Sequence, residues 1–370
     1  MATLPKLLPN EPKASSDRRQ TELTARHLLP AIAELEAFLL HMRADLDPVL
    51  RARLPDKRGK PYPLGQCLEI STAVEERLET VEEAGLPPAA AGGLRALRDF
   101  RRAGGSVRLV WGDLRGEYFQ NAFQIGTLYV DVSNDTVTPT KPKVEILPFE
   151  QARFSAIRDF RHFSRVAASY WKETAYPNHV LPALAPYCPL IHVAANGRIV
   201  LREISDYMIL LTRSRGFAPS EAVLRDARMP QAVFDRVRDA LRDSGQALPD
   251  SPEEGRKQAL AQCRRARHAH MTPGVVPQVV RTAQALNNTL VPRTTAPPPS
   301  TPLPTVTPMP TIKINDIEYE LDSLSSDAQA HYKSIQFVDA ELARLQAHTA
   351  ALQTARSAYC AALKAALPGA

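Results

Sequence analysis

Cysteine is scarce in this chain. Its 370 residues include four cysteines, Cys67, Cys188, Cys263 and Cys360, which lie far apart and form no C-x-x-C pair. So few thiols in a chain of this length exclude a disulfide framework and favour a reducing compartment.

Long apolar runs are missing as well. In the body of the chain, the longest stretch without Asp, Glu, Lys or Arg runs from Thr174 to Gly197, and prolines interrupt it repeatedly. Such a stretch is too broken to span a membrane, and residues 1–20 lack the apolar core of a secretory signal. We therefore expect no membrane span and a cytoplasmic location. Export by a secretion system that reads the N-terminal segment stays open.

Motifs for catalysis and cofactor binding are also lacking. The chain contains no G-x-G-x-x-G, G-x-S-x-G or H-E-x-x-H, and no Lys-Ser/Thr follows Gly112 and Gly116 to make a phosphate loop. The sequence therefore indicates no cofactor and leaves open whether the protein is an enzyme.

Apolar residues make up 44% of the chain and the formal net charge is +6. This apolar content supports packed cores, and the length suggests two or three domains. The basic stretch from Arg256 to Arg267 lies at the end of a predicted helix, where positive charge complements the helix dipole, and no aromatic residues interleave it. Nucleic acid is therefore not the expected partner.

We predict an α+β fold that begins with helices. Residues 1–20 are predicted to be a flexible start and residues 21–104 a helical subdomain. Helical spacing of apolar residues predicts helices over 21–53, interrupted at Pro30, and over 64–83 and 94–102, with a loop at 85–93.

Residues 105–271 are predicted to form an α+β domain with a small antiparallel sheet. β-forming residues predict strands at 107–111, 127–132 and 143–147, while 114–123 fits a helix or a strand. Pro148 indicates the start of a helix that extends to Lys172. Asn196-Gly197 between two apolar runs predicts a hairpin with a type I′ turn. Further helices are predicted over 203–212, 220–244 and 252–270.

Residues 272–311 are predicted to be a Pro/Thr-rich linker in which order fades from Thr272. Its second half, 292–310, reads PRTTAPPPSTPLPTVTPMP, a composition that favours an extended, semi-rigid spacer.

Residues 312–370 are predicted to be an interaction module with a β-hairpin around Asn315-Asp316 and a long helix over 335–367. Apolar residues of that helix recur at alternating spacings of three and four, which is typical of a coiled-coil seam. The helix is expected to bind a protein partner or a second copy, and the alternative is that the hairpin folds back on its first half. The interaction residues are Val338, Leu342, Leu345, Leu352, Arg356, Tyr359 and Leu363.

This module resembles a short bacterial domain family of unknown function. The resemblance covers residues 312–367 and rests on Ile317-Glu318-Tyr319, on the LDSLS turn at 321–325, and on the helix start QFVDAELARLQ at 336–346. Members commonly have glycine in the hairpin turn, where this chain has Asn315-Asp316. The resemblance implies a hairpin followed by helices and no particular activity. Residues 1–290 resemble no family known to us.

Candidate polar chemistry is concentrated in residues 112–145. Asp131 ends a predicted strand, and Asn134 and Asp135 follow on a turn, so three oxygen ligands suited to a divalent metal come close together in sequence. The alternative is that the Ser-Asn-Asp turn is closed by its own side-chain hydrogen bonds.

Two histidines of the central domain are candidates for acid–base chemistry. His179 lies in a proline-containing loop and His192 on a strand, and the two could join Asp131 or Asp135 in a metal site or a general-base pair. Tyr118 is the fourth catalytic candidate.

Two main functional hypotheses follow from the sequence, beside a weaker one of nucleic-acid binding through Arg256–Arg267. The first is a non-enzymatic or accessory protein that binds a partner through its α+β body and docks or oligomerises through residues 312–370. The second is an enzyme of unassigned class with a polar site, and a divalent metal is open, in the central domain.

Overall fold

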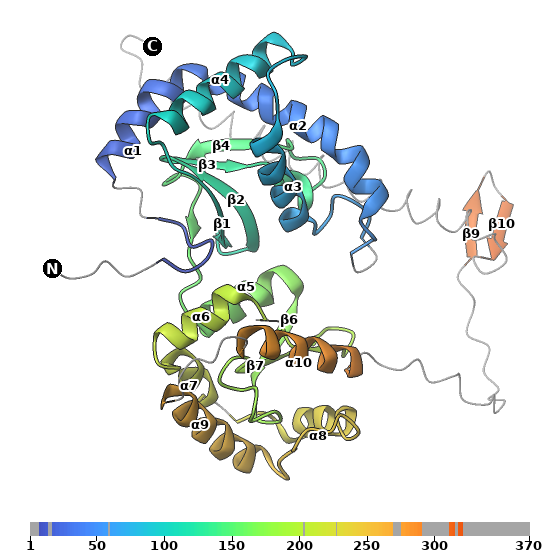
Figure 1. Cartoon of the computed structure of the whole chain (residues 1–370). Coiled ribbons are helices and arrows are strands. Elements are labelled where there is room, and N and C mark those ends of the chain that lie inside the picture. Colours follow the sequence, from blue (N-terminus) through green and yellow to red (C-terminus); the bar gives the residue numbers. More distant parts are fainter. Residues whose placement is uncertain are drawn as a thin grey trace, which may run out of the picture. The chain divides into compact units, whose positions relative to one another are not determined.

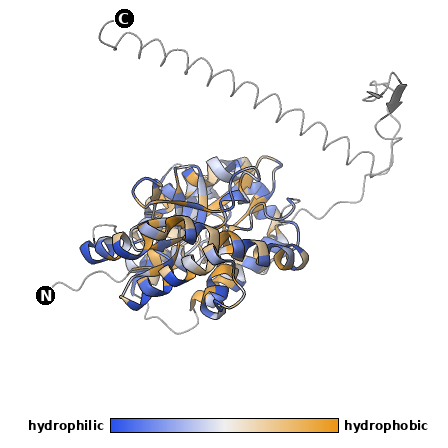
Figure 2. Cartoon of the chain, turned by 90° about the horizontal axis from the view of Figure 1, so that it is seen from above, coloured by the Kyte–Doolittle hydropathy of each residue, from blue (hydrophilic) through white to orange (hydrophobic). Residues whose placement is uncertain are grey.

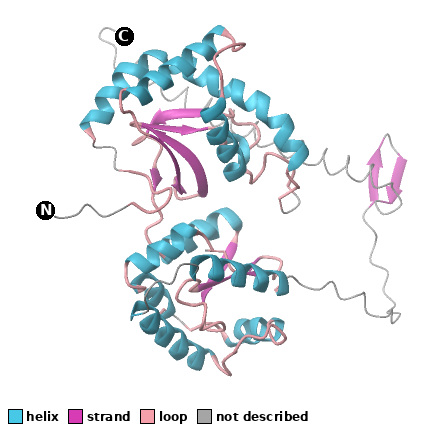
Figure 3. Cartoon of the chain, viewed as in Figure 1, coloured by secondary structure: helices cyan, strands magenta, loops and turns pink. Residues whose placement is uncertain are grey.

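A computed structural model of the chain describes residues 7–13, 17–57, 60–202, 204–226, 228–268, 275–290, 311–314 and 317–320. The chain divides into two compact units, Met1–Thr294 and Thr295–Ala370. The described residues have the predicted α+β architecture, with helices and antiparallel strands (Figures 1 and 3).

The first unit begins with a helical layer. Its helices are α1 (Arg18–Leu23), α2 (Ile32–Arg53), α3 (Cys67–Thr80) and α4 (Pro88–Arg102). Between α1 and α2 the chain passes through a π-helical turn at Thr24–Leu28 and a 3-10 turn at Leu29–Ala31 that contains Pro30. The predicted interruption at Pro30 is confirmed, because proline cannot donate the hydrogen bond that a continuous helix requires.

A curved, five-stranded antiparallel sheet follows, which forms half of a barrel (Figure 1). Its strands, in the order β4-β3-β2-β1-β5, are β1 (Val107–Leu114), β2 (Tyr118–Ile125), β3 (Leu128–Asp131), β4 (Glu145–Pro148) and β5 (Phe154–Ser155). Arg115 and Gly116 both have positive φ in the turn that joins β1 to β2. This turn settles the ambiguous segment 114–123 in favour of a strand.

The rest of the first unit combines a small sheet with helices. The sheet has the order β6-β7-β8, and all its pairs are antiparallel. The elements are α5 (Phe160–Trp171), β6 (Glu173–Pro177), β7 (Leu190–Ala194), β8 (Ile199–Val200), α6 (Asp206–Ser214), α7 (Ala218–Leu224), α8 (Gln231–Ala240), α9 (Pro252–His268) and α10 (Val275–Thr289).

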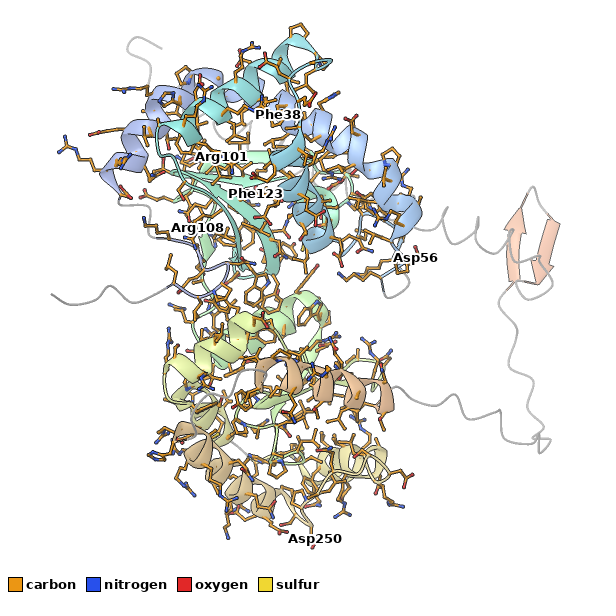
Figure 4. All side chains as sticks on the ribbon, viewed as in Figure 1. Phe38, Asp56, Arg101, Arg108, Phe123 and Asp250 are labelled. Carbon is orange, nitrogen blue, oxygen red and sulfur yellow. The ribbon has the colours of Figure 1, made fainter. Side chains whose placement is uncertain are left out.

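One face of the five-stranded sheet packs against α2, α3 and α4. Phe38 of α2 and Phe123 of β2, both labelled in Figure 4, lie in this core with Phe100 of α4 and Ile70 of α3. The helices carry hydrophilic and hydrophobic residues side by side, as amphipathic helices do (Figure 2). The opposite face of the sheet is filled by Phe149 and Phe154, which contact Tyr129.

The same face of β2 that carries Phe123 also carries Phe119, because side chains two residues apart on a strand share a face. Phe119, however, packs in a second core, with Phe163 and Val166 of α5. The face is therefore covered by α2, α3 and α4 at one end and by α5 at the other, and Asn121 lies between the two covers.

Several predicted elements are wrong. The helix predicted from Pro148 begins only at Phe160, because Pro148 ends β4 and the intervening residues place Phe149 and Phe154 under the sheet. The loop predicted at 85–93 is largely helical, since α4 begins at Pro88, a favoured first residue of a helix. The single helix predicted over 220–244 is two helices, and Pro230 precedes the second.

The predicted fading of order from Thr272 is also wrong, because α10 occupies Val275–Thr289. Val279, Ala283 and Leu286 are buried in a core of the first unit. The Asn287 side chain bonds both the N–H and the carbonyl of Leu201, at 2.8 and 3.0 Å. The helix therefore belongs to the fold of the first unit.

Part of the predicted flexible start contacts the sheet. Trp111 donates its N–H to the carbonyl of Asn10 at 2.8 Å, and the Gln124 amide bonds both main-chain groups of Lys13. Asp17 caps α1 by accepting from two backbone N–H groups. The described residues 7–13 thus cover an edge of β1 that would otherwise be open to pairing.

The hairpin at Asn196-Gly197 is confirmed, but its turn is not of type I′. A type I′ turn needs two residues with positive φ, and of these two only Gly197 has it, at 79°. The Ala194 carbonyl accepts a hydrogen bond from the Gly197 N–H, and the Ala194 N–H donates to the Arg198 carbonyl. This is the pattern of a three-residue loop closed by a left-handed glycine.

The second unit contains the predicted hairpin. β9 (Thr311–Ile314) and β10 (Ile317–Glu320) pair antiparallel, with Ile314 opposite Ile317 and Ile312 opposite Tyr319. The proline-rich residues 292–310 and the seven predicted interaction residues from Val338 to Leu363 lie outside the described residues.

Within the described part of the chain, no helix combines the length and apolarity needed to cross a membrane.

Candidate functional site

A buried arginine organises the charges between α2 and the sheet. Arg43 donates from Nη1 and Nη2 to the two carboxylate oxygens of Asp135, at 3.0 Å each, and from Nε to Asp47 at 2.8 Å. Lys143 and the Tyr62 hydroxyl also bond Asp47. Burial alone would raise the pKa of Asp47, but these donors outweigh it and leave that pKa below its ordinary value. The cluster ties the helical layer to the β3–β4 connection.

Asp131 lies in a separate buried network. Its carboxylate accepts from the Gln120 amide at 2.7 Å, the Tyr129 hydroxyl at 3.0 Å, and both the N–H and the hydroxyl of Ser133. Burial nevertheless raises the pKa of Asp131, despite these four donors. The carboxylate closes the turn after β3, which is the structural alternative considered for this segment.

The three predicted metal ligands therefore point to different partners. Asp131 bonds Gln120, Asp135 bonds Arg43, and the Asn134 amide donates to the carbonyl of Pro142 at 2.9 Å. Among the residues that the structure describes, no three His, Cys, Asp or Glu side chains are grouped to hold a metal ion.

His179 fills the break between α7 and α8. Its Nε2 donates to the Leu224 carbonyl at 3.1 Å, and its Nδ1 accepts from the Met229 N–H at 3.4 Å, so the ring must be neutral. Burial lowers the pKa of His179, in agreement with that tautomer. Its role in this geometry is to satisfy two main-chain groups at the break.

His192 and Tyr118 lie in other surroundings. His192 is buried on β7, with its ring edge-on to Phe163 and its Nδ1 3.8 Å from Glu173. Tyr118 packs edge-on against Tyr170, and burial raises its pKa. The partners described here for Asp131, His179, His192 and Tyr118 all differ, so these contacts do not join the four catalytic candidates into one site.

The basic stretch at the end of α9 is partly used within the fold. Arg267 bonds the Gly216 carbonyl and Glu221, while Arg256 bonds the Arg225 carbonyl. These contacts hold α9 against α7 and leave less of the stretch for a phosphate backbone.

A cavity of about 190 Å³ opens between α3 and α5, at the position of Asn121. We call it the aromatic pocket, and its lining residues are Lys57, Lys60, Gly65, Cys67, Leu68, Trp111, Phe119, Asn121, Tyr170 and Trp171.

Four aromatic side chains form its walls. Trp111 stacks on Phe119 with ring centroids 5.6 Å apart, and Trp171 lies 4.8 Å from Phe119 on a tilted plane. Tyr170 is stacked 5.8 Å from Trp171. Trp111 and Trp171 are the two tryptophans of the entire sequence. The walls are thus rigid and apolar, and they come from β1, β2 and α5.

The polar part of the lining comes from α3 and β2. Asn121 is 6% exposed, and its amide nitrogen has one weak contact, 3.5 Å from the sulfur of Cys67. Burial raises the pKa of the Cys67 thiol, which keeps it protonated and a poor nucleophile.

The N-terminus of α3 lies at this lining. Gln66, at the cap position, makes no side-chain bond to the helix and donates its amide to the Pro55 carbonyl instead. Cys67 and Leu68, the first two residues of α3, line the pocket, and their N–H groups lie at the positive end of the helix.

Sequence analysis missed the aromatic pocket, because its walls come from segments about sixty positions apart. The available signal was the two tryptophans of the chain, Trp111 on a predicted strand and Trp171 directly after Tyr170.

Comparison of the chain with family models, curated proteins and solved structures gave no match. The pocket is therefore interpreted from its own residues.

Proposed function

We propose that this chain is a non-enzymatic binding protein. Its α+β body receives a partner at the aromatic pocket, and residues 312–370 dock the protein or join copies of it. The observation that carries the proposal is a contrast within the first unit. The side chains of Arg43, Asp131 and His179 are held in hydrogen bonds within the fold, whereas Asn121 presents a nearly buried amide to a cavity. Unused polar groups beside aromatic walls are typical of binding sites.

The proposed docking role of residues 312–370 is supported by sequence spacing. Leu342, Leu345 and Leu352 belong to a repeat of three and four, which places them on one seam of a helix. A proline-rich segment precedes the hairpin and favours an extended chain.

The assembly part is tested by the mass in solution of three proteins. We expect the full chain to be a dimer or larger, and residues 1–294 to be monomeric. The double substitution Leu342→Glu with Leu345→Glu should reproduce the truncation, because it places charge in the apolar seam. Ala347→Glu, on the outer side of the same heptad, is the matched control and should keep the wild-type mass. A full chain that is monomeric and retains no partner would contradict the proposal.

The partner-binding part is tested separately, with full-length protein as bait in a lysate of the source cells. Trp171→Ala should lose the captured partner, because the pocket loses one wall. Arg101→Ala, at an exposed ion pair with Glu79, should retain it. Equal capture by both variants would show that the partner binds elsewhere.

A further inference from the structure

We infer that the aromatic pocket binds a small, one-ring aromatic carboxylate. The inference rests on the proposed function, since it names the ligand class for the same pocket. Four features of the lining lead to it: size, aromatic walls, the sign of the charge and the distance between charge and ring.

The size limits the ligand to one ring. An apolar cavity of about 150 Å³ binds benzene, and this pocket has about 190 Å³. The difference leaves room for a few more atoms, such as a carboxylate.

The walls favour an aromatic ligand over an aliphatic one. Trp111, Phe119, Tyr170 and Trp171 present ring faces and edges around one space, and such groups attract another ring in stacked or edge-on geometry. Aromatic pairs are worth about 0.5–1.5 kcal/mol beyond the apolar area that they bury. A saturated ring of the same size would lose that contribution.

The charge of the lining selects an anion. The described lining residues include Lys57 and Lys60 and no carboxylate. Lys57 forms an ion pair with Glu69 at 2.6 Å. Lys60 is therefore the cation whose charge is more available to a ligand. The positive end of α3 lies at the lining, and the Asn121 amide nitrogen faces only a weak sulfur acceptor. A carboxylate oxygen would give each of these groups a favourable interaction partner.

The spacing requires that ring and carboxylate lie close together in the ligand. Asn121 is two residues from Phe119 on the same face of β2, so the Cα atoms of this polar and this aromatic lining residue are about 7 Å apart. A carboxylate attached directly to a ring fits this distance.

The two tryptophans supply a direct readout, because both line the pocket and the chain has no others. Tryptophan fluorescence of the full-length protein is titrated with sodium benzoate, and we expect a saturable change. Cyclohexanecarboxylate tests the need for an aromatic ring, and benzyl alcohol tests the need for charge. Each should bind at least about tenfold more weakly than benzoate, which corresponds to about 1.4 kcal/mol.

Two substitutions test the assignment of the anion. Asn121→Asp places a negative charge against the carboxylate and should weaken benzoate binding by at least about tenfold. Asn196→Asp, at the exposed β7–β8 turn, is the matched control and should bind as wild type does. Lys60→Gln changes an exposed side chain, so this variant should fold. It therefore still tests the anion site if Asn121→Asp does not fold. It should weaken binding by a smaller factor and make binding less sensitive to salt.

No saturable change with benzoate up to about 10 mM, well above the ~1 mM of a −4.1 kcal/mol interaction, would overturn the inference. Equal binding of cyclohexanecarboxylate, or unchanged binding by Lys60→Gln and Asn121→Asp, would also overturn it. If benzoate fails while Trp171→Ala still loses the captured partner, the proposed function stands and the ligand class is wrong. If both fail, the pocket is not a binding site.

Discussion

Arg43 and Asp135 are 92 positions apart in the sequence, yet they form a two-pronged ion pair in which neither side chain is more than 5% exposed. Both bonds are 3.0 Å long. Arg43 lies on α2 and Asp135 on the β3–β4 connection, so this contact joins the helical layer to the sheet. A buried charge is costly unless it is paired, and each partner therefore depends on the other.

Arg43→Met should destabilise the first unit by about 3–5 kcal/mol, because Asp135 keeps its buried charge and loses both bonds. The measurement is urea unfolding of the wild type and the variant. Arg101→Met removes an ion pair in which both side chains are well exposed, and it should change stability by less than about 0.5 kcal/mol. A loss below about 1 kcal/mol at Arg43 would mean that water reaches the site.

Two neighbouring glycines of α4 should respond oppositely to alanine. A Cβ on Gly93 would overlap the Glu34 carbonyl of α2, so Gly93→Ala must push the helices apart and destabilise the protein by about 1–3 kcal/mol. A Cβ on Gly92 would lie 3.3 Å from the Glu34 side chain, which can move. Gly92→Ala should therefore be neutral or gain up to about 1 kcal/mol of helix propensity. Thermal melting of both variants distinguishes the two positions, and equal effects would contradict the close packing of α2 on α4.

His179 should make the protein less stable in mild acid. Its folded pKa is lowered by burial, so below about pH 6.5 the unfolded chain binds a proton that the folded protein resists. Stability from this group is complete above that pH and is lost as the pH falls toward the folded pKa. The Met229 bond would break on protonation, because Nδ1 could no longer accept it.

The measurement is the free energy of unfolding between pH 7.5 and pH 5.5. His179→Gln should have a smaller pH dependence than the wild type, although the substitution itself lowers stability. Arg101→Met, which removes a guanidinium that does not titrate in this range, should keep the wild-type slope. An unchanged slope in His179→Gln would assign the acid sensitivity to other groups.

Asp131 should behave as a structural carboxyl. Its folded pKa is raised, so the stability that it contributes is complete at low pH and falls as the pH rises through the folded pKa. Asp131→Asn does not ionise and should gain stability relative to the wild type as the pH rises from 4 to 7. Gln120 can turn its amide to accept from the new side chain, since its oxygen has no partner among the described residues.

The same variant tests the metal hypothesis for Asp131, Asn134 and Asp135. Because donors already occupy the Asp131 carboxylate, Mg²⁺ or Ca²⁺ should shift the melting temperature of wild type and Asp131→Asn equally. A metal-dependent rise confined to the wild type would place a cation on this carboxylate.

Local sequence signals predicted several elements correctly. The hairpins at Asn196-Gly197 and Asn315-Asp316, and the interruption at Pro30, depend on the conformations that a few adjacent residues can adopt. Such preferences act without distant contacts. The α+β class followed from them, because the periods of two and of 3.6 residues are both present in the chain.

The failures share a dependence on distant contacts. Phe154, Ile157 and Phe160 have helical spacing, but Phe154 is needed under the sheet beside Tyr129, and the helix therefore starts later. Residues 275–289 have weak signals of their own and become helical where Val279 and Leu286 find a core.

The sequence by itself determined the alternation of helices and strands, the places of the two hairpins and the heptad spacing in residues 335–367, because each depends on neighbours along the chain. Tertiary structure alone decided that Arg43 meets Asp135 and that Trp111 and Trp171 line one pocket. It also decided that the contacts of the four catalytic candidates do not join them into one site. Those results depend on which faces of distant elements pack together, and the free energy of that packing is set by the whole core rather than by any local segment.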